Sequence, residues 1–429
     1  MSEQKRIVKN TILLLSSTGI GKGLLLLTNI LAVRLFGAEV YGIFVFSLAI
    51  YMIIQRFTLF GTNYGIIKTI SAYSEKGDLT ERNSTVSFAI VFVTIVSVIT
   101  VIIIRIGLVV FRDKIDINYI GPLKTLVFYL VVISILHTLA SIFQARHQML
   151  IFTASVNLIP GLMFLTLVVL FYYLTNLSPI NVLVMARLSS VFIPLLFLFL
   201  WVRKIKIMES LSRKHVPAYK KFIRFVSPLM GSELLIGLDA HLNILVLGIM
   251  MGASDVAIFN GALQVAFVCS FILASVSQAF TPTIASLYHK GSIKKLGELY
   301  GKITIILLAA SIIFLLAIWM LRTFIMGLYG EEFLRGATSL VILASGYSFA
   351  ALSGPCGRMN TMMGYPQYQL YISIGLIIVK FLLSIWLISI WGIMGAAIAT
   401  MICSVLSNML RMILLYRHSG ILPFKVRYS

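Results

Sequence analysis

Charged residues are scarce in this sequence, and acidic ones are the scarcest. Lysine, arginine, aspartate and glutamate together make up 11% of the 429 residues, whereas about 25% is usual in soluble proteins. Only 14 residues are acidic, against 35 basic ones, and no polar stretch is long enough to fold a soluble core of its own. The composition therefore excludes an ordinary soluble domain and predicts a protein that works inside a lipid bilayer.

Cysteines and catalytic motifs are also few. Cys269, Cys356 and Cys403 are scattered in apolar segments, which is typical of small packing residues rather than of a disulfide framework or a metal site. The chain has no H-E-x-x-H motif, no nucleotide-binding loop and no acidic pair in a long extracytoplasmic loop. The sequence predicts no catalytic residue, no metal and no cofactor, and it leaves coupling to H⁺ or Na⁺ open.

Long apolar runs are what the sequence has instead. Apolar residues make up 59% of the chain, and the mean hydropathy is +1.01. Because lipid does not tolerate unpaired backbone, and a spanning helix needs about 20 apolar residues, we expect an all-α integral membrane protein of about 12 transmembrane helices. The expected spans lie near residues 10–33, 40–62, 84–110, 124–145, 149–175, 181–202, 223–248, 253–280, 299–321, 333–357, 367–389 and 391–416. The first run has no convincing cleavage site, so we expect an uncleaved helix rather than a secretory signal.

The positions of the basic residues test this count of helices. With the N-terminus in the cytoplasm, 24 of the 35 basic residues fall in cytoplasmic segments, 6 fall outside and 5 lie within spans. This bias is the pattern of the positive-inside rule for an even number of helices with both termini cytoplasmic. The net charge of +21 then reflects topology and contact with anionic lipids. Nucleic-acid binding is the weaker explanation, because no basic segment belongs to a soluble module.

The two halves of the chain are related in sequence. Gly37-Ala38-Glu39-Val40-Tyr41-Gly42-Ile43-Phe44 aligns with Gly252-Ala253-Ser254-Asp255-Val256-Ala257-Ile258-Phe259, half a chain later. Each segment joins the first two expected helices of its half, which indicates two six-helix bundles in the same orientation. We expect an N-terminal bundle at 1–202, a basic cytoplasmic linker at 203–222 and a C-terminal bundle at 223–429.

Four segments in order resemble one family of transporters. They are LAVRLFGAEVYGIFVFSLAI (31–50), GASDVAIFNGALQV (252–265) with FTPTIASLYHKGSIKKLGELY (280–300), YGEEFLRGATSLVILASG (329–346) and GIMGAAIAT (392–400). Together they resemble the polysaccharide-export or lipid-linked oligosaccharide flippases (Wzx-like) of the multidrug/oligolipidyl-lipid/polysaccharide (MOP) exporter superfamily. The resemblance covers essentially the whole chain. It implies a MATE/MOP-like fold, with helices 1, 2, 7 and 8 lining a central cavity.

Basic residues within the spans are the candidates for substrate binding, since an intramembrane charge is costly and is usually functional. Lys22 lies in helix 1 among three glycines that we expect to loosen the helix, Arg56 lies in helix 2, and Lys380 is central in helix 11. Arg187 is shallower, in helix 6. For a lipid-linked sugar, these cations would meet the diphosphate. The alternative is that they pair structurally with acids of the other half.

Helix 7 supplies the acids. Asp239 and Asn243 are spaced to share one helical face, whereas Glu233 lies elsewhere on the wheel. We expect Asp239 or Glu233 to couple transport to H⁺ or Na⁺, or to gate it by pairing with Lys22 or Arg56, and we include Asn243 in this group. A static ion pair is the alternative.

The resemblance and the buried cations together predict a flippase for undecaprenyl (or other polyprenyl) diphosphate-linked oligosaccharides in the cytoplasmic membrane of a prokaryote. Its expected partners are the lipid-linked glycan and membrane lipids, with a polysaccharide polymerase and glycosyltransferases as further candidates. A cation-coupled multidrug exporter of the same superfamily is the main alternative. A membrane-bound transferase and a scaffold without transport are weaker ones.

Overall fold

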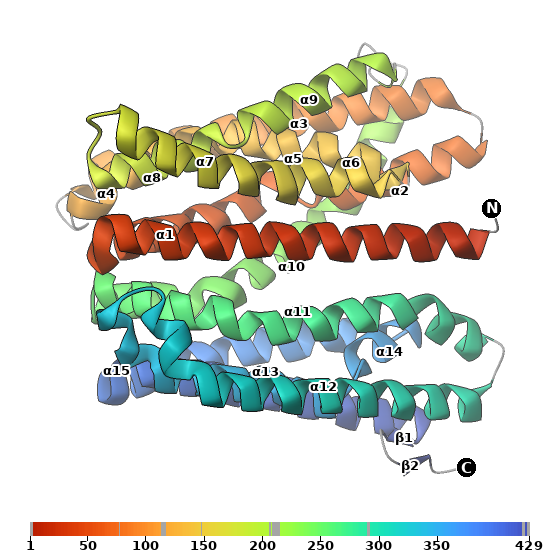
Figure 1. Cartoon of the computed structure of the whole chain (residues 1–429). Helices are drawn as coiled ribbons and strands as arrows, with labels where there is room; N and C mark the ends of the chain where they lie inside the picture. Colours follow the sequence, from red (N-terminus) through yellow and green to blue (C-terminus); the bar gives the residue numbers. More distant parts are fainter. Residues whose placement is uncertain are drawn as a thin grey trace. The chain divides into compact units, whose positions relative to one another are not determined.

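The computed structural model describes residues 3–76, 78–112, 117–146, 148–205, 207, 215–289, 292–422 and 425–426. The described chain is almost entirely helical, as Figure 1 shows. It divides into two compact units, Met1–His241 and Leu242–Ser429, called the first and second unit below. The boundary between the units therefore falls within one helix, α10 (Val216–Met250).

Among its described residues, the first unit has the following helical segments before α10. In chain order they are α1 (Glu3–Leu59), α2 (Thr62–Lys76), α3 (Leu79–Val110), α4 (Ile117–Phe128), α5 (Leu130–Ala145), α6 (Met149–Thr153), the π-helix η2 (Ala154–Leu158), α7 (Ile159–Leu174), α8 (Pro179–Ser189) and α9 (Phe192–Lys204).

The second unit begins in α10 and ends in a short hairpin. Its segments are α11 (Ala253–His289), α12 (Ile293–Gly327), the 3₁₀ helix η4 (Glu331–Gly336), α13 (Ala337–Leu352), α14 (Cys356–Met362), α15 (Pro366–Ser419), β1 (Ile421–Leu422) and β2 (Lys425–Val426). The strands are antiparallel, with Ile421 opposite Val426 and Leu422 opposite Lys425.

These helices agree with the predicted fold of about 12 transmembrane helices in two six-helix bundles. Within the described residues, eight continuous helical stretches are long and apolar enough to cross a membrane, and the pair α4–α5, bent by 43°, gives a ninth. Two of the eight contain two spans each, because α1 breaks at Gly37 and α15 breaks at Gly392. The segments α13 and α14 supply the remaining predicted span.

Glycines with positive φ make the tightest of these turns. Gly37 has φ of 83° and Gly252 has φ of 134°, in a region that residues with a Cβ rarely adopt. These two glycines are also the first positions of the aligned segments in the two halves. Both aligned positions therefore adopt a positive φ that favours glycine, so the two segments correspond in backbone conformation as well as in residue type.

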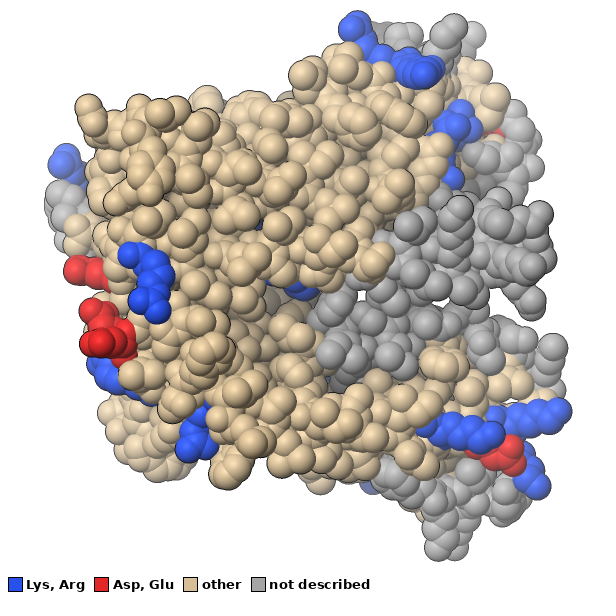
Figure 2. Space-filling view, in the orientation of Figure 1, with Lys and Arg blue, Asp and Glu red and all other residues tan. Residues whose placement is uncertain are grey.

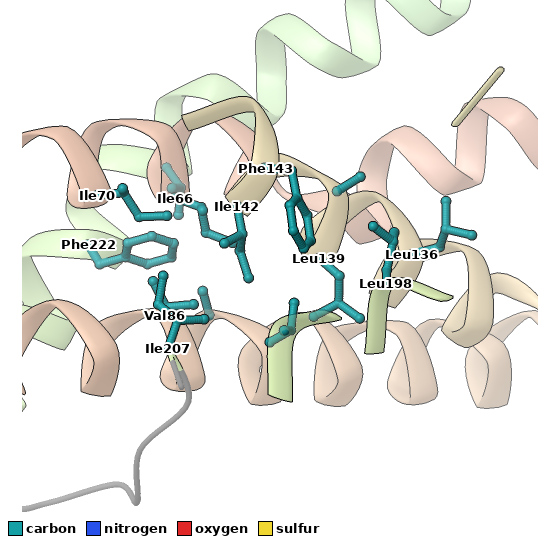
Figure 3. Packing of buried hydrophobic residues seen from close by; sticks show 14 of the residues in the cluster. Ile66, Ile70, Val86, Leu136, Leu139, Ile142, Phe143, Leu198, Ile207 and Phe222 are labelled. Carbon is teal, nitrogen blue, oxygen red and sulfur yellow. The ribbon is translucent and has the colours of Figure 1, made fainter. Parts of the chain in front are cut away.

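The core of the first unit is built from α2, α3, α5, α9 and the start of α10. Figure 3 shows Ile66, Val86, Ile142 and Phe143 packed with Phe222, which comes from α10. The first turns of α10 are thus part of this core. Apolar side chains also cover the outside of the helices, where α3 and α12 expose many isoleucines and leucines. In Figure 2, most of the visible charged atoms lie toward the ends of the helices, and the surface between them is largely uncharged, as suits lipid.

Candidate functional site

An arginine and a glutamate from two helices meet in the first unit. Arg56 lies in the last turn of α1, and its Nη1 donates a hydrogen bond of 2.5 Å to Oε2 of Glu233 on α10. The Glu233 side chain is 4% exposed, whereas the Arg56 side chain is 44% exposed. The carboxylate is therefore buried, while the Arg56 side chain keeps 44% of its surface exposed.

Tyr64 on α2 lies near the same pair and interacts electrostatically with Glu233 and Arg56. Helix spacing did not predict this contact, because the chain breaks between α1 and α2 at Phe60 and Gly61, with φ of 51° and 71°. The break changes the direction of the helix between Arg56 and Tyr64. Both residues thereby lie near the same buried carboxylate, which accepts a hydrogen bond from Arg56.

Glycines let α10 approach α1 and α2 closely. A Cβ on Gly61 would lie 2.7 Å from Leu229 Cβ, and one on Gly65 would lie 2.6 Å from Phe222 and Val226. On α10 itself, a Cβ on Gly237 would lie 3.2 Å from Cγ of Arg56. Since Gly237 is one turn beyond Glu233, α10 presents a flat surface on which the Arg56 side chain rests.

Arg187, in the last turn of α8, is held differently. Its guanidinium carbon lies 5.4 Å from the centroid of the Phe164 ring on α7, a cation–π contact. Protein surrounds the side chain, although part of its surface stays accessible. Both Arg187 and Arg56 act electrostatically on His137 of α5. The structure thus places two of the predicted cations in one polar region of the first unit.

Lys22 lies on α1 as an exposed residue. The prediction that its neighbouring glycines loosen the helix is wrong, because within α1 only Gly37 leaves the helical conformation. Gly21 instead permits close packing, since a Cβ there would lie 3.0 Å from Cβ of Asn157 in η2. The small residue at Gly21 therefore allows η2 to pack against α1, and it does not bend α1.

The polar groups of the second unit are more enclosed. Lys380 on α15 is 7% exposed, and Asn243 on α10 is 4% exposed. The Asn243 amide donates to the Ala396 carbonyl oxygen at 3.0 Å and to Oγ1 of Thr400 at 2.5 Å, and it accepts from Ser384 at 2.5 Å. Ser384 also donates to the carbonyl of Lys380. Asn243 thus fastens α10 to two parts of α15.

Asp239 and Asn243 do not share an environment, although their spacing predicted one face. Asp239 is exposed and belongs to the first unit, whereas Asn243 is buried in the second. A unit boundary between them places successive turns of α10 in different surroundings. Among the residues that the structure describes, no group of three or more His, Cys, Asp or Glu side chains is placed to hold a metal ion.

Two family descriptions match the chain. The family "Polysaccharide biosynthesis protein" matches residues 7–288, more than half of the sequence, and the MatE family matches residues 228–386. The comparison with curated proteins found no match to this chain. These families agree with the predicted resemblance to flippases of the MOP superfamily.

Solved structures give the same fold at low identity. An inward-facing multidrug-resistance transporter of the MATE family is 17% identical with a TM-score of 0.74, covering 96% of this chain and 98% of the other. The lipid II flippase MurJ, in an inward closed conformation, is 13% identical with a TM-score of 0.74, covering 94% and 87%. A MOP-superfamily transporter from Pyrococcus furiosus, titled for the reverse polarity of its binding pocket, is 16% identical with a TM-score of 0.68, covering 97% and 96%. The matched families and neighbours are membrane transporters and flippases, not enzymes.

Proposed function

Because the chain belongs to the polysaccharide biosynthesis protein family, we propose that it is a flippase for lipid-linked glycans. Its cargo is an oligosaccharide repeat unit on undecaprenyl or another polyprenyl diphosphate. It moves this cargo across the cytoplasmic membrane of a prokaryote by alternating access, for the synthesis of cell-surface polysaccharide. The fold similarity to the lipid II flippase MurJ supports this choice.

The observation that carries the proposal is the accessible guanidinium of Arg56 beside a buried carboxylate. Arginine binds phosphate oxygens through two parallel N–H bonds, so the free edge of Arg56 suits a diphosphate. Lys22, which is exposed on α1, adds a point charge to the same role. Arg187 and Lys380 complete the proposed set of cargo-binding cations.

Glu233 is the proposed gate. A diphosphate on Arg56 competes with the Glu233 carboxylate for the same N–H groups, and a weakened pair frees α10 to move relative to α1 and α2. Asp239, exposed on the same helix, is the proposed residue for coupling to H⁺ or Na⁺. Asn243 contributes by holding the far part of α10 to α15.

The positive-inside bias supports cytoplasmic N- and C-termini, with the basic 203–222 linker on the same side. A polysaccharide polymerase and glycosyltransferases are the proposed partners, since they use the flipped lipid or supply it. Both would act at the membrane, so no soluble complex is required.

Reconstitution into proteoliposomes with a fluorescent polyprenyl-diphosphate sugar tests the function, with accessibility of the label in each leaflet as readout. We expect protein-dependent flipping that the double variant Arg56→Gln/Glu233→Gln loses at least tenfold. The double variant is the informative one, because it removes the cation without leaving a buried carboxylate unpaired. Equal flipping by the double variant and the parent protein would remove Arg56 from the site.

The coupling residue is tested in the same vesicles. An imposed H⁺ or Na⁺ gradient is expected to accelerate flipping by the parent protein and to lose that effect in Asp239→Asn. Unchanged dependence on the gradient in Asp239→Asn eliminates this carboxylate from coupling.

A cation-coupled multidrug exporter is the second candidate. It is supported by the MatE match over 228–386 and by the fold similarity to a MATE transporter. Protein-dependent efflux of an organic cation such as ethidium, without flipping of any of several polyprenyl-diphosphate sugars, would decide for it.

A further inference from the structure

The short helix α14 lies at the end of the second unit that also carries the β1–β2 hairpin (Figure 1). Met359 of α14 packs there with Leu415 of α15 and Ile421 of β1 in one buried cluster. Asn360, the next residue of α14, is 0% exposed, and its side-chain amide donates at 2.8 Å to the carbonyl oxygen of Arg411 on α15. These contacts hold α14 against the last turns of α15.

Gly357, one turn before Asn360, brings two further polar side chains close to α14. A Cβ at Gly357 would lie 3.6 Å from Cδ of Arg411 and 3.8 Å from Oε1 of Gln369. Gln369 comes from the start of α15 and Arg411 from the part beyond the break at Gly392. Two distant parts of one helix therefore direct polar side chains to the same point, where Gly357 itself places no atom.

Polar atoms of all three side chains lack a partner. Among the described residues, Nε of Arg411, Nε2 of Gln369 and Oδ1 of Asn360 are buried and make no hydrogen bond. Such atoms are rare in folded proteins and require an explanation, such as a group that binds there. Two of the atoms are donors and one is an acceptor. The missing group must therefore offer oxygens that accept hydrogen bonds and a hydroxyl or amine that donates one.

The sequence around this group favours an anion. No aspartate or glutamate follows Glu332, so neither α14 nor α15 has a carboxylate to pair with Arg411. Arg358 and Arg417 add positive charge at the same end and are both exposed. The positive-inside bias assigns this end to the cytoplasmic surface, where anionic lipids attract basic residues.

Aromatic side chains extend from this group toward the ends of α15. Tyr365 stacks on His418 with ring centroids 3.9 Å apart, and Tyr368 lies 5.7 Å from His418. Tyr365 is one turn before Gln369, and His418 is two turns after Arg411. The neighbouring turns of α15 expose apolar side chains, namely Ile374, Leu410 and Ile413. Tyrosine rings next to exposed apolar side chains are typical of the level of lipid head groups.

We propose that Asn360, Gln369 and Arg411 bind a lipid phosphate whose head group also carries a hydroxyl. Arg411 and Gln369 donate to the phosphate oxygens, and the hydroxyl donates to Oδ1 of Asn360. The Arg411 and Gln369 side chains are partly exposed, so the head group approaches from the surface with a small movement of these two side chains. A choline head group does not fit, because it has no donor and adds positive charge.

Two lipids share this chemistry. One is a phospholipid such as phosphatidylglycerol, which the membrane supplies whatever the cargo is. The other is a polyprenyl-diphosphate sugar, in which sugar hydroxyls follow the diphosphate. This second version rests on the proposed function, so the experiment has one arm for each source.

The first arm measures lipid binding to the full-length protein in detergent by native mass spectrometry. The probes are phosphatidylglycerol, phosphatidylmethanol and phosphatidylcholine with the same acyl chains. Phosphatidylmethanol keeps the anionic phosphate and lacks the hydroxyl. We expect one phosphatidylglycerol to bind about tenfold tighter than phosphatidylcholine, with phosphatidylmethanol between them. Arg411→Gln should weaken this binding about tenfold, and Gln369→Leu severalfold, as expected for hydrogen bonds to a charged group.

Arg417→Gln is the matched control. Arg417 lies six residues after Arg411, at the same end of α15 but on another side of the helix, and it is exposed. Binding of phosphatidylglycerol should be unchanged in this variant. If Arg411→Gln does not fold, Gln369→Leu carries the test. No preference for phosphatidylglycerol over phosphatidylcholine, or equal binding by the parent and both site variants, overturns the site. Equal binding of phosphatidylmethanol and phosphatidylglycerol removes Asn360 from it.

The second arm adds a polyprenyl-diphosphate sugar to the protein with bound phosphatidylglycerol. If the cargo uses this site, the sugar lipid displaces phosphatidylglycerol, and Arg411→Gln lowers flipping in proteoliposomes at least tenfold. If the sugar lipid leaves phosphatidylglycerol in place, the site belongs to the phospholipid. If the parent protein flips no sugar at all, the proposed function fails while the binding result of the first arm still stands.

Discussion

The ion pair of Arg56 and Glu233 in the first unit is partly open to solvent, whereas the polar network around Asn243 in the second unit is closed. The Arg56 side chain is 44% exposed beside a carboxylate that is 4% exposed. In the second unit, Asn243 uses its amide donors and its carbonyl acceptor on α15, Ser404 donates to the Gly346 carbonyl, and Ser353 donates to Asn408.

This difference distinguishes two polar sites with different exposure. A charged group in a low-dielectric site is costly unless solvent, a partner or a ligand reaches it, and Arg56 has an exposed surface for this. Closed networks give rigidity and a unique packing arrangement. The network around Asn243 thus holds α10 to α15.

The largest expected effect comes from filling the contact between α2 and α10. Gly61→Ala places a Cβ against Leu229 at a residue with φ of 71°, so we expect a loss of about 2–4 kcal/mol from strain and overpacking. Thermal unfolding in detergent should show a much lower midpoint. Gly107→Ala is the control, because a Cβ there meets nothing within 4 Å, and it should leave the midpoint unchanged or raise it. Equal behaviour of the two variants would contradict the close approach of α10.

The ion pair of the first unit should respond asymmetrically to removal of either partner. Arg56→Gln leaves a buried carboxylate without its ion-pair partner, and we expect a cost of about 1–3 kcal/mol. Glu233→Gln leaves an arginine that is 44% exposed, so solvent compensates and the cost should be smaller. Unfolding midpoints of the two variants and of the double variant measure this. A lower unfolding midpoint in Glu233→Gln than in Arg56→Gln would contradict the expectation that the buried carboxylate needs its partner more than the exposed arginine does.

Removal of a hydrogen bond from the network around Asn243 should lower the free energy of unfolding by less than the burial of its atoms suggests. Asn243→Leu removes three hydrogen bonds, and hydrogen bonds between membrane helices contribute about 0.6 kcal/mol each, so a loss of about 2 kcal/mol is expected. Ser404→Ala, with its one bond to Gly346, should lose about a third of that. If both variants lose the same amount, Asn243 is not the centre of the network.

The smallest effect should come from the ion pair at the end of α11. Arg335 Nη1 and Asp255 Oδ1 are 4.0 Å apart and are partly or largely exposed, so Asp255→Asn should change stability by less than about 1 kcal/mol. Thermal unfolding at low and high salt measures this. A large, salt-sensitive loss would show that charge at this end is as important as charge within the first unit.

Hydropathy was enough to predict the helices, because lipid leaves the backbone no alternative to internal hydrogen bonding. The turns at Gly37 and Gly252 were also visible in the sequence, since a positive φ requires the residue type that was found there. The positions of the helices follow from the lipid solvent, and the two turns follow from the local chemistry of glycine. Both can be predicted without knowing how the helices pack.

Side-chain partners could not be derived in the same way. Tyr64 reaches Glu233 only because the chain breaks at Phe60, and periodicity carried through that break gives the wrong direction. Asp239 and Asn243 share a helical face by spacing, yet the surroundings of α10 change between them.

The breaks at Gly37 and Gly392 also bear on how the chain enters the membrane. Each joins two spans through a single non-helical residue, so the first two and the last two spans have no loop between them. Such pairs are suited to insertion as preformed hairpins. Neither turn offers a protease an extended segment or tolerates an inserted epitope, so labels that report topology belong elsewhere in the chain.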